Sequence, residues 1–216
     1  MEINTGARRV RDANSFRDKV SEFILSMNGF IKDRCDDLLV PYVDLYSDFG
    51  SPDREDLLDP ALAIGDNAHL NMEGQKRLAR CFHEGYLKDA DGATTIVCLG
   101  DSHTQGFPVR EPSRNGLPVD LAVDDPHQYP YWLKEWTGKI LINRGIAGNT
   151  IYGLKKRFDK EVLPHLPDHC FIQGGTNDSL LGTPLEESEK DMEDLIERCL
   201  SAEIIPVVGT IIPLGF

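Results

Sequence analysis

Short apolar segments that alternate with helical patterns are the feature of this sequence that most limits its fold. Five apolar segments bounded by glycine or turn residues are predicted to be strands, and they span residues 41–46, 94–99, 139–143, 170–174 and 204–212. Apolar residues recur with helical spacing over residues 15–38, 72–87, 129–136, 152–162 and 184–201. Such alternation is typical of a parallel sheet that is covered on both faces. We therefore expect a three-layer α/β/α sandwich with a five-stranded parallel sheet.

The length of the chain and its turn signals refine this expectation. A chain of 216 residues matches one domain or two small ones, and we expect a single domain over residues 1–216. Thr183 is predicted to cap the last helix, because Pro184 would occupy the first helical position and Glu186 follows three residues after the cap. Residues 106–128 form the longest segment without a clear element, and a loop of that length is usually functional or mobile.

The charge balance excludes two classes of partner. The chain has 36 Asp and Glu residues against 23 Lys and Arg residues, which gives a formal net charge of −13. A surface of this sign repels nucleic-acid phosphates and anionic lipid headgroups, which bind through Lys and Arg. We therefore expect neither nucleic acid nor a membrane as a partner. No segment approaches the roughly 18 apolar residues of a spanning helix, and the first residues lack the apolar core of a secretory signal, so we expect a cytoplasmic protein.

The cysteines indicate a reducing compartment and no metal site. There are five, an odd number, they are widely spaced, and no Cys-x-x-Cys pair occurs among them; they are Cys35, Cys81, Cys98, Cys170 and Cys199. This spacing argues against both a disulfide framework and a zinc site. We expect buried free thiols.

A candidate nucleophile follows the predicted strand 94–99 directly. The segment Gly100-Asp101-Ser102 places a serine at the carboxyl end of a parallel strand, where open α/β sheets expose their reactive groups. Glycines on either side permit a tight turn that projects the serine oxygen outward. The same pattern fits a plain turn in which the serine caps the next helix. Asp101 is expected to cap or brace this turn.

Two further strand ends carry hydrogen-bond donors. The strand 139–143 leads into a glycine-rich turn that includes Gly148, whose N–H is unobstructed and suits a developing oxyanion. The strand 170–174 leads to Asn177, whose side-chain amide is a donor that does not titrate. The alternatives are an ordinary turn for the glycine and a turn or cap for the asparagine.

A carboxylate and an imidazole lie three residues apart in a fourth segment, Asp66 to His69, before the helical pattern 72–87. Asp66 can reach one ring nitrogen of His69 and fix its tautomer, which leaves the other nitrogen free to take a serine proton. A surface ion pair or a helix cap is the alternative for this pair alone.

Taken together, the four segments resemble the SGNH/GDSL hydrolase family, whose sequence blocks contribute a nucleophilic Ser, an oxyanion Gly, an oxyanion Asn and a His with its Asp. The resemblance implies a flavodoxin-like fold with Ser102 as the nucleophile. His69 would be the general base and Asp66 its orienting partner. The oxyanion hole would consist of the Ser102 and Gly148 N–H groups and the Asn177 amide. No cofactor or metal is implied, and activity should fall at acid pH as His69 becomes protonated.

The order of the blocks departs from the family pattern. In the family the Asp-x-x-His block closes the domain, whereas here His69 precedes Ser102 by 33 residues (102 − 69). Residues 8–87 resemble the family's carboxyl-terminal third, and residues 93–216 resemble its amino-terminal two thirds. This order is that of a circular permutation, whether by natural rearrangement, by engineering or by excision from tandem domains. The polar segment 87–93 is long enough to join the two parts, since seven extended residues span up to about 23 Å.

The resemblance implies a serine esterase that acts through an acyl-enzyme, and the acidic charge and the absent membrane signal favour a small soluble ester as its substrate. An acyltransferase with the same residues and an inactive binding module are the alternatives. His103 and Arg110 are candidate substrate contacts, although a turn residue that points away and a solvated loop charge are the plainer interpretations. A homodimer, including one that exchanges the amino-terminal segment, is also compatible with this sequence. The ester and its acyl chain length are left open.

Overall fold

The computed structural model describes residues 5–90, 92, 95–108, 123 and 125–216, and for residues 5–14 it describes the backbone alone. Five parallel strands form one sheet in the order β1-β7-β6-β4-β5. The strands are β1 (Tyr42–Val43), β4 (Thr95–Gly100), β5 (Ile140–Gly145), β6 (His169–Gln173) and β7 (Ile205–Gly209). The predicted five-stranded parallel sheet is therefore confirmed.

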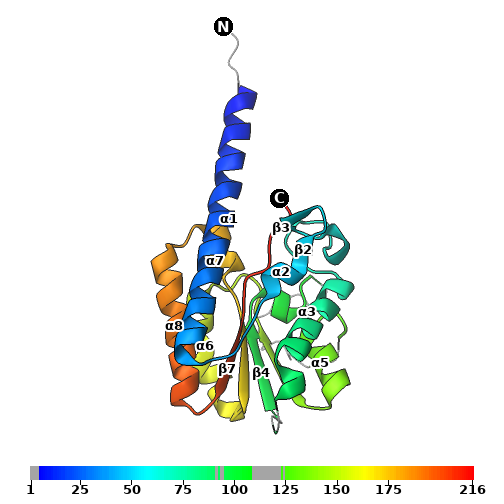
Figure 1. The fold of residues 1–216 in the computed structure, drawn as a ribbon, viewed down its shortest axis with the longest axis vertical. Coiled ribbons are helices and arrows are strands. Elements are labelled where there is room, and N and C mark those ends of the chain that lie inside the picture. The colour runs from blue at the N-terminus through cyan, green and yellow to red at the C-terminus, as the bar shows by residue number, and fades with distance from the viewer. Residues whose placement is uncertain (1–4, 91, 93–94, 109–122, 124) are drawn as a thin grey trace, which may run out of the picture.

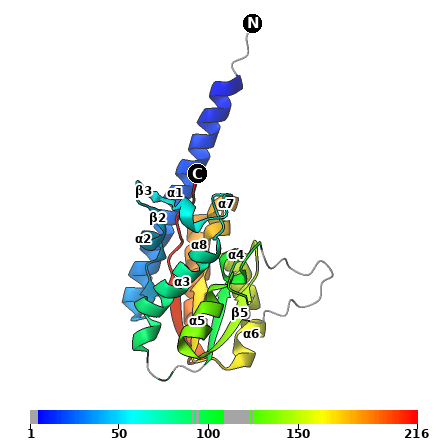
Figure 2. The same ribbon diagram turned by 90° about the vertical axis from the view of Figure 1, so that its right-hand side faces the viewer.

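Helices cover both faces of this sheet (Figure 1). One layer contains α1 (Thr5–Leu38), α6 (Ile151–Glu161) and α8 (Leu185–Ser201). The other contains α3 (Met72–Gly85) and α5 (Tyr129–Thr137), which lie in front of the sheet in Figure 2. The three-layer α/β/α architecture is confirmed.

Strand β4 shows why the predicted strands are apolar throughout. Val97 and Leu99 pack against the layer of α1, α6 and α8, whereas Ile96 and Cys98 pack against the layer of α3 and α5. Successive side chains of a strand point to opposite faces, so a sheet that is buried on both faces needs apolar residues at every position. All four side chains are fully buried.

An aromatic stack fixes α3 to the sheet. Phe82 of α3 lies with its ring centroid 4.9 Å from that of Phe171 in β6 and 5.3 Å from that of Tyr129 in α5. All three rings are buried. Because α3 begins just after His69, this packing determines where the preceding segment meets the sheet.

Short elements complete the described chain. They are α2 (Leu45–Phe49), α4 (Ser102–Gln105), α7 (Thr176–Leu181), the antiparallel pair β2 (Gly50–Ser51) and β3 (Arg54–Leu58), and the 3-10 turns η1 (Pro60–Leu62), η2 (Leu87–Asp89) and η3 (Leu163–His165). None of these was among the predicted elements.

Several predicted boundaries are wrong, and the largest difference is in the first helix, which is expected to begin at residue 15 and begins at Thr5. The strand expected over residues 41–46 stops at Val43, because the Asp44 side chain accepts from the Ser47 N–H and starts α2. Pro184, and not Thr183, is the residue before α8, since the Thr183 N–H is bonded to the Asp178 carbonyl at the end of α7. The strand expected over 204–212 ends at Gly209.

The chain beyond β7 is held by α1. Asn28 of α1 accepts from the Ile211 N–H at 2.7 Å and donates to the Ile211 carbonyl at 3.0 Å. Nearer the amino end of α1, the centroid of the Phe16 ring lies 6.2 Å from that of the Phe216 ring. The first helix and the last residues of the chain are therefore neighbours.

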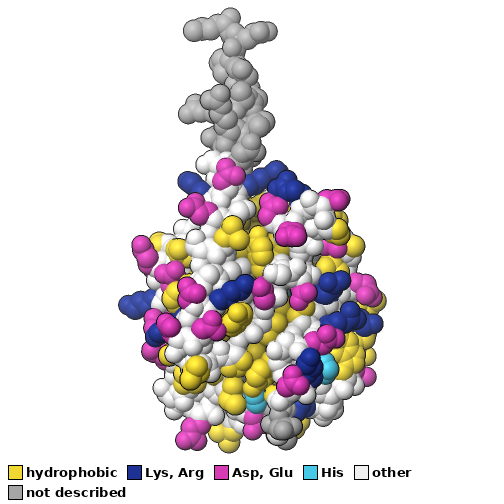
Figure 3. All heavy atoms as spheres, in the orientation of Figure 1, with side chains coloured by type: hydrophobic (Ala, Val, Ile, Leu, Met, Phe, Trp, Pro, Cys, Tyr) yellow, Lys and Arg dark blue, Asp and Glu magenta, His cyan; other side chains and the backbone are white. Residues whose placement is uncertain are grey.

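Acidic and basic side chains are interspersed on the face that Figure 3 shows. Within the part of the chain that the structure describes, no helix combines the length and apolar character needed to cross a bilayer.

Candidate active site

The candidate nucleophile lies at the carboxyl edge of the sheet. Ser102 is the first residue of α4 and follows β4 after one residue, Asp101; it is 5% exposed. Asp101 caps this helix by accepting from the His103 N–H at 2.9 Å, as the sequence predicts. The serine is thus held at a rigid turn between a central strand and a short helix.

Gly145 allows α4 to sit close against the sheet. A Cβ atom added at Gly145 would lie 2.1 Å from the Gln105 backbone nitrogen, far inside van der Waals contact. Asn143 strengthens the same junction, because its amide donates to the Thr104 carbonyl at 2.7 Å and its oxygen accepts from the Gly145 N–H. The end of β5 therefore supports the helix that carries Ser102.

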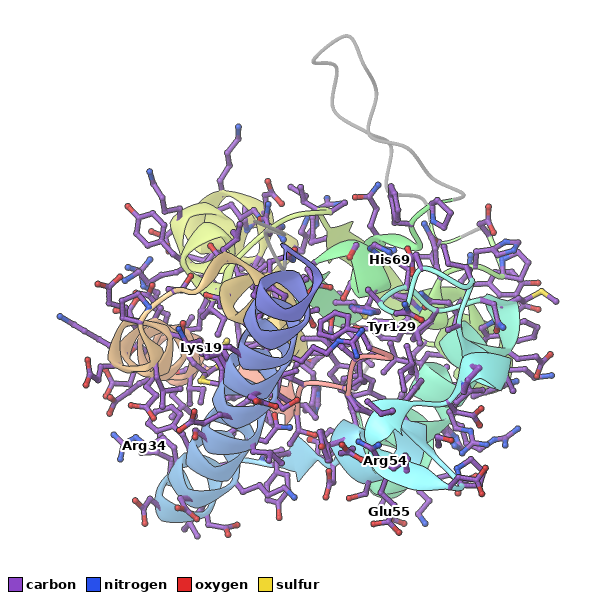
Figure 4. The ribbon with its side chains drawn as sticks, turned by 90° about the horizontal axis from the view of Figure 1, so that it is seen from above. Lys19, Arg34, Arg54, Glu55, His69 and Tyr129 are labelled. Atoms are coloured by element: carbon purple, nitrogen blue, oxygen red, sulfur yellow. The ribbon has the colours of Figure 1, made fainter. Side chains whose placement is uncertain are left out.

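His69 and Ser102 meet at this edge although 33 residues separate them. The His69 Nε2 atom lies 3.1 Å from the Ser102 Oγ atom. Figure 4 looks down on this edge and shows His69 beside the ribbon of α4. On the other side of the ring, His69 Nδ1 lies 2.6 Å from Asp66 Oδ2. Because a carboxylate accepts the Nδ1 proton, Nε2 carries the lone pair and can receive the serine proton.

Asp66 is held in its charged form. Partial burial alone would raise its pKa, but hydrogen bonds from the His69 backbone and ring and from the Ala68 N–H outweigh this effect, and the pKa of Asp66 is lowered. The carboxylate therefore stays ionised and orients His69 over a wide pH range.

Two contacts that the sequence analysis missed position the His69 ring and its segment. The Phe107 ring lies 4.6 Å from the His69 ring, centroid to centroid. The Asn71 side chain caps α3 through the Gly74 N–H and donates to the carbonyls of Ala61 and Ala63. Asn71 directly precedes the helical pattern 72–87, a typical N-cap position for asparagine, so a cap signal was available in the sequence.

The predicted oxyanion donors follow three adjacent strands. Ser102 follows β4, Gly148 follows β5, and Asn177 lies in α7 after β6. Gly148 has a φ of +80°, a conformation that favours glycine. The Asn177 amide donates to the Asn149 carbonyl at 2.9 Å, which ties α7 to the turn that holds Gly148. An amide carries two N–H donors, so one is still available to a ligand.

A partly buried arginine, also missed from the sequence, links the same segments. Arg157 of α6 donates to the Gly100 carbonyl at 2.8 Å and to Asn149 Oδ1 at 2.9 Å, and it pairs with Glu161. Burial lowers the pKa of Arg157, although the neighbouring Glu161 opposes this effect. One guanidinium thus connects the end of β4 to the turn after β5.

The structure describes one of the two predicted substrate contacts, His103, and does not describe the other, Arg110. His103 is 1% exposed, its Nδ1 atom lies 3.1 Å from Asp101 Oδ1, and its Nε2 atom lies 2.9 Å from the Ala68 carbonyl. With both nitrogens bonded to protein groups, this arrangement leaves neither for a substrate. Arg110 lies outside the described residues.

The described residues contain no group of three or more His, Cys, Asp or Glu side chains with the geometry of a metal site. All five cysteines are free and buried. The arrangement of Ser102, His69 and Asp66 can transfer a proton from the serine hydroxyl to the imidazole, and neutral N–H donors follow the neighbouring strands.

Comparison with known proteins adds a family match. The model of the GDSL-like Lipase/Acylhydrolase family matches residues 98–216. The "Uncharacterized lipoprotein YqeF" of Bacillus subtilis (strain 168) is 28% identical over 138 residues, and the match covers 57% of this chain and 50% of that protein. The chain thus spans about half the length of the curated relative that it matches.

Two solved structures are similar over part of the chain. A G-D-S-L family protein from Desulfitobacterium hafniense DCB-2 is 27% identical, with a TM-score of 0.44 over 53% of this chain and 58% of that chain. The psychrotrophic esterase EstA from Pseudoalteromonas sp. is 23% identical, with a TM-score of 0.43 over 56% of this chain and 61% of that chain. The residues of the family match include Ser102, Gly148 and Asn177, whereas Asp66 and His69 precede them.

Proposed function

Since the chain belongs to the GDSL-like lipase/acylhydrolase family, we propose that it is a serine esterase that hydrolyses a small soluble carboxylic ester through an acyl-enzyme on Ser102. One observation carries the proposal. His69 Nε2 lies 3.1 Å from Ser102 Oγ while Asp66 holds the opposite ring nitrogen at 2.6 Å. This is the arrangement in which a base activates a serine and a carboxylate orients the base.

The first half of the proposed reaction forms the acyl-enzyme. His69 takes the Ser102 proton, and the serine oxygen attacks the ester carbonyl carbon. The resulting oxyanion is stabilised by the N–H groups of Ser102 and Gly148 and by the free amide N–H of Asn177. His69 then donates its proton to the leaving alcohol as the ester C–O bond breaks.

The second half releases the acid. His69 takes a proton from a water molecule, whose oxygen attacks the acyl carbon. The tetrahedral intermediate collapses, the bond to Ser102 breaks, and His69 returns the proton to the serine oxygen. An alcohol in place of water would give an acyltransferase with the same residues, and comparison of free acid with transferred product distinguishes the two reactions.

The acidic surface favours a small soluble ester over a bilayer lipid as substrate, because anionic headgroups and a net charge of −13 repel each other. An acetyl ester is our example of this class. The cytoplasmic location stays a prediction: the five free, buried cysteines fit a reducing compartment, whereas the relative from Bacillus subtilis is named a lipoprotein. Immunoblots of cytoplasmic and membrane fractions test the location.

A circular permutation of the family domain is the second part of the proposal. Residues 8–87 would correspond to the family's carboxyl-terminal third and residues 93–216 to its first two thirds. The family match begins at residue 98, after Asp66 and His69. If β4 is counted as the first strand, the sheet β5-β4-β6-β7-β1 reads 2-1-3-4-5, which is the flavodoxin-like order.

A fluorophosphonate probe tests the activity, because it reacts with activated serines. We expect one probe per chain in the wild-type protein, no labelling of Ser102→Ala, and at least about 1000-fold slower labelling of His69→Ala. Hydrolysis of p-nitrophenyl esters of increasing chain length and of acetylated saccharides then identifies the substrate class. A folded wild-type protein that the probe does not label would favour a binding module and refute the esterase.

A further inference from the structure

His103 joins the two segments that supply the proposed nucleophile and base. Its backbone belongs to α4, one residue after Ser102, and its ring reaches the carbonyl of Ala68, one residue before His69. It therefore supplies a second hydrogen bond between the segments that the His69–Ser102 contact connects.

The partners of His103 favour a proton on each ring nitrogen. The Ala68 carbonyl can only accept, so Nε2 donates to it at 2.9 Å. On the other side, Nδ1 lies 3.1 Å from Asp101 Oδ1, an oxygen that already accepts from the His103 backbone N–H. Two acceptors around one imidazole are satisfied together when the ring is an imidazolium.

Burial supports the same protonation state. Asp101 is 0% exposed, and its Oδ2 atom has no hydrogen-bond partner. A buried carboxylate needs a neighbouring positive charge, which an imidazolium supplies. Burial alone would lower the pKa of His103, but the charge and hydrogen bond of Asp101, the Ala68 carbonyl and the charge of Asp66 outweigh it, and the pKa is raised.

The segment that His103 reaches is exposed. Asp66 and Asn67 are exposed, and His69 is half-buried. A displacement of about 1 Å at a reacting group is enough to reduce a rate about 100-fold. The buried His103 ring holds the Ala68 carbonyl. Ala68 precedes His69 in the chain, so a movement of Ala68 would carry the His69 ring away from Ser102.

We propose that His103 is a positioning residue, whose doubly protonated ring holds the Asp66–His69 segment against the Ser102 turn. This inference rests on the proposed esterase function. His103 takes no part in bond making or breaking; its effect reaches the reaction through the placement of His69.

Two variants separate the two ring nitrogens. In His103→Gln the amide nitrogen lies at about the position of Nε2 and still donates to the Ala68 carbonyl. In His103→Asn it lies at about the position of Nδ1, so the bond to Asp101 remains and the bond to Ala68 is lost. We expect kcat for p-nitrophenyl acetate and the rate of probe labelling to fall about 10- to 100-fold in His103→Asn and less than about 3-fold in His103→Gln, with KM nearly unchanged.

The pH profile gives a second readout. The charged and titratable groups around the His103 ring are Asp101, Asp66 and His69, whose ring centroid lies 5.9 Å away. Because the folded pKa is raised above that of a free imidazole, the imidazolium persists to higher pH than in a free histidine and is lost as the pH rises through the folded pKa. A neutral ring has one N–H for two acceptors, so labelling of the wild-type protein should slow at alkaline pH. His103→Gln should lack this loss, because an amide does not titrate in this range.

Equal rates for the two variants, or parallel alkaline profiles for His103→Gln and wild type, would overturn the positioning role. If His103→Asn does not fold, the comparison of pH profiles between His103→Gln and wild type decides alone. The ¹⁵N NMR signals of the ring provide an independent check, since a singly protonated His103 at pH 7 refutes the inference. Failure of the proposed esterase function gives a different result, because the folded wild-type protein would then not be labelled by the probe.

Discussion

At the level of the single residue, the proposed mechanism gives Asn177 a second task beside its structural one. One amide N–H is bonded to the Asn149 carbonyl at 2.9 Å and keeps the turn after β5 against α7. The other N–H is available to an oxyanion. An amide suits both tasks because it donates two hydrogen bonds and carries no charge.

Replacement of Asn177 should therefore affect turnover more than stability. In Asn177→Ala we expect kcat to fall about 100- to 1000-fold, the usual effect of removing one oxyanion donor. Ester hydrolysis measures this change, and thermal unfolding shows whether the variant is folded at the assay temperature. A folded variant that keeps more than a third of the wild-type kcat would contradict the oxyanion role.

At the level of elements, α1 and the segment after β7 depend on each other. Asn28 is 5% exposed, and it satisfies both the N–H and the carbonyl of Ile211. A buried backbone group that loses its partner costs about 1–3 kcal/mol. The side chain of one helical residue thus replaces the strand pairing that Ile211 would have had if β7 continued.

In Asn28→Ala both Ile211 groups lose their partner. We expect the free energy of unfolding to decrease by about 2 kcal/mol or more, as measured by urea denaturation. Ser26→Ala is the matched control, because Ser26 is exposed on the same helix and its replacement should change stability by less than about 0.5 kcal/mol. Equal stability of the two variants would show that this pair of hydrogen bonds does not anchor α1.

At the level of the whole molecule, the proposed permutation concerns the order of the chain and not its packing. Phe16 of α1 and Phe216 lie with their rings 6.2 Å apart, so a short linker can join these two regions. The sequence that connects η2 and β4 is polar and turn-rich, and breaks in segments of this composition are usually tolerated.

A chain that is relinked in this way tests the proposal. It would begin near residue 91, continue to Phe216, pass through a glycine-serine linker to residue 15 and end near residue 90. We expect it to fold and to be labelled by the fluorophosphonate probe at Ser102 within about threefold of the wild-type rate. A relinked chain that folds but is not labelled would mean that the site depends on the present chain order.

The sequence alone determined the layers and the edges of this fold. The spacing of apolar residues is a local property of the sequence. Continuous apolar runs such as 94–99 predicted strands that are buried on both faces, and the helical spacing in 184–201 predicted a helix that covers the sheet. The positions of Ser102, Gly148 and Asn177 followed from the strands before them, because parallel strands end at one edge. Short elements such as α2 were missed, since caps of one or two residues decide them.

Local sequence patterns do not determine which distant groups meet: the family resemblance implied the pairing of His69 with Ser102, and the tertiary structure brings the two together. The contact of His69 with Ser102 depends on the order of the strands and on the packing of α3 through Phe82, and neither is written in local spacing. The same holds for His103, whose neighbours in sequence did not reveal that its ring is enclosed between Asp101 and the Ala68 carbonyl. Local pattern fixes which face of an element is apolar, whereas the partners of a buried polar group depend on how the faces pack together.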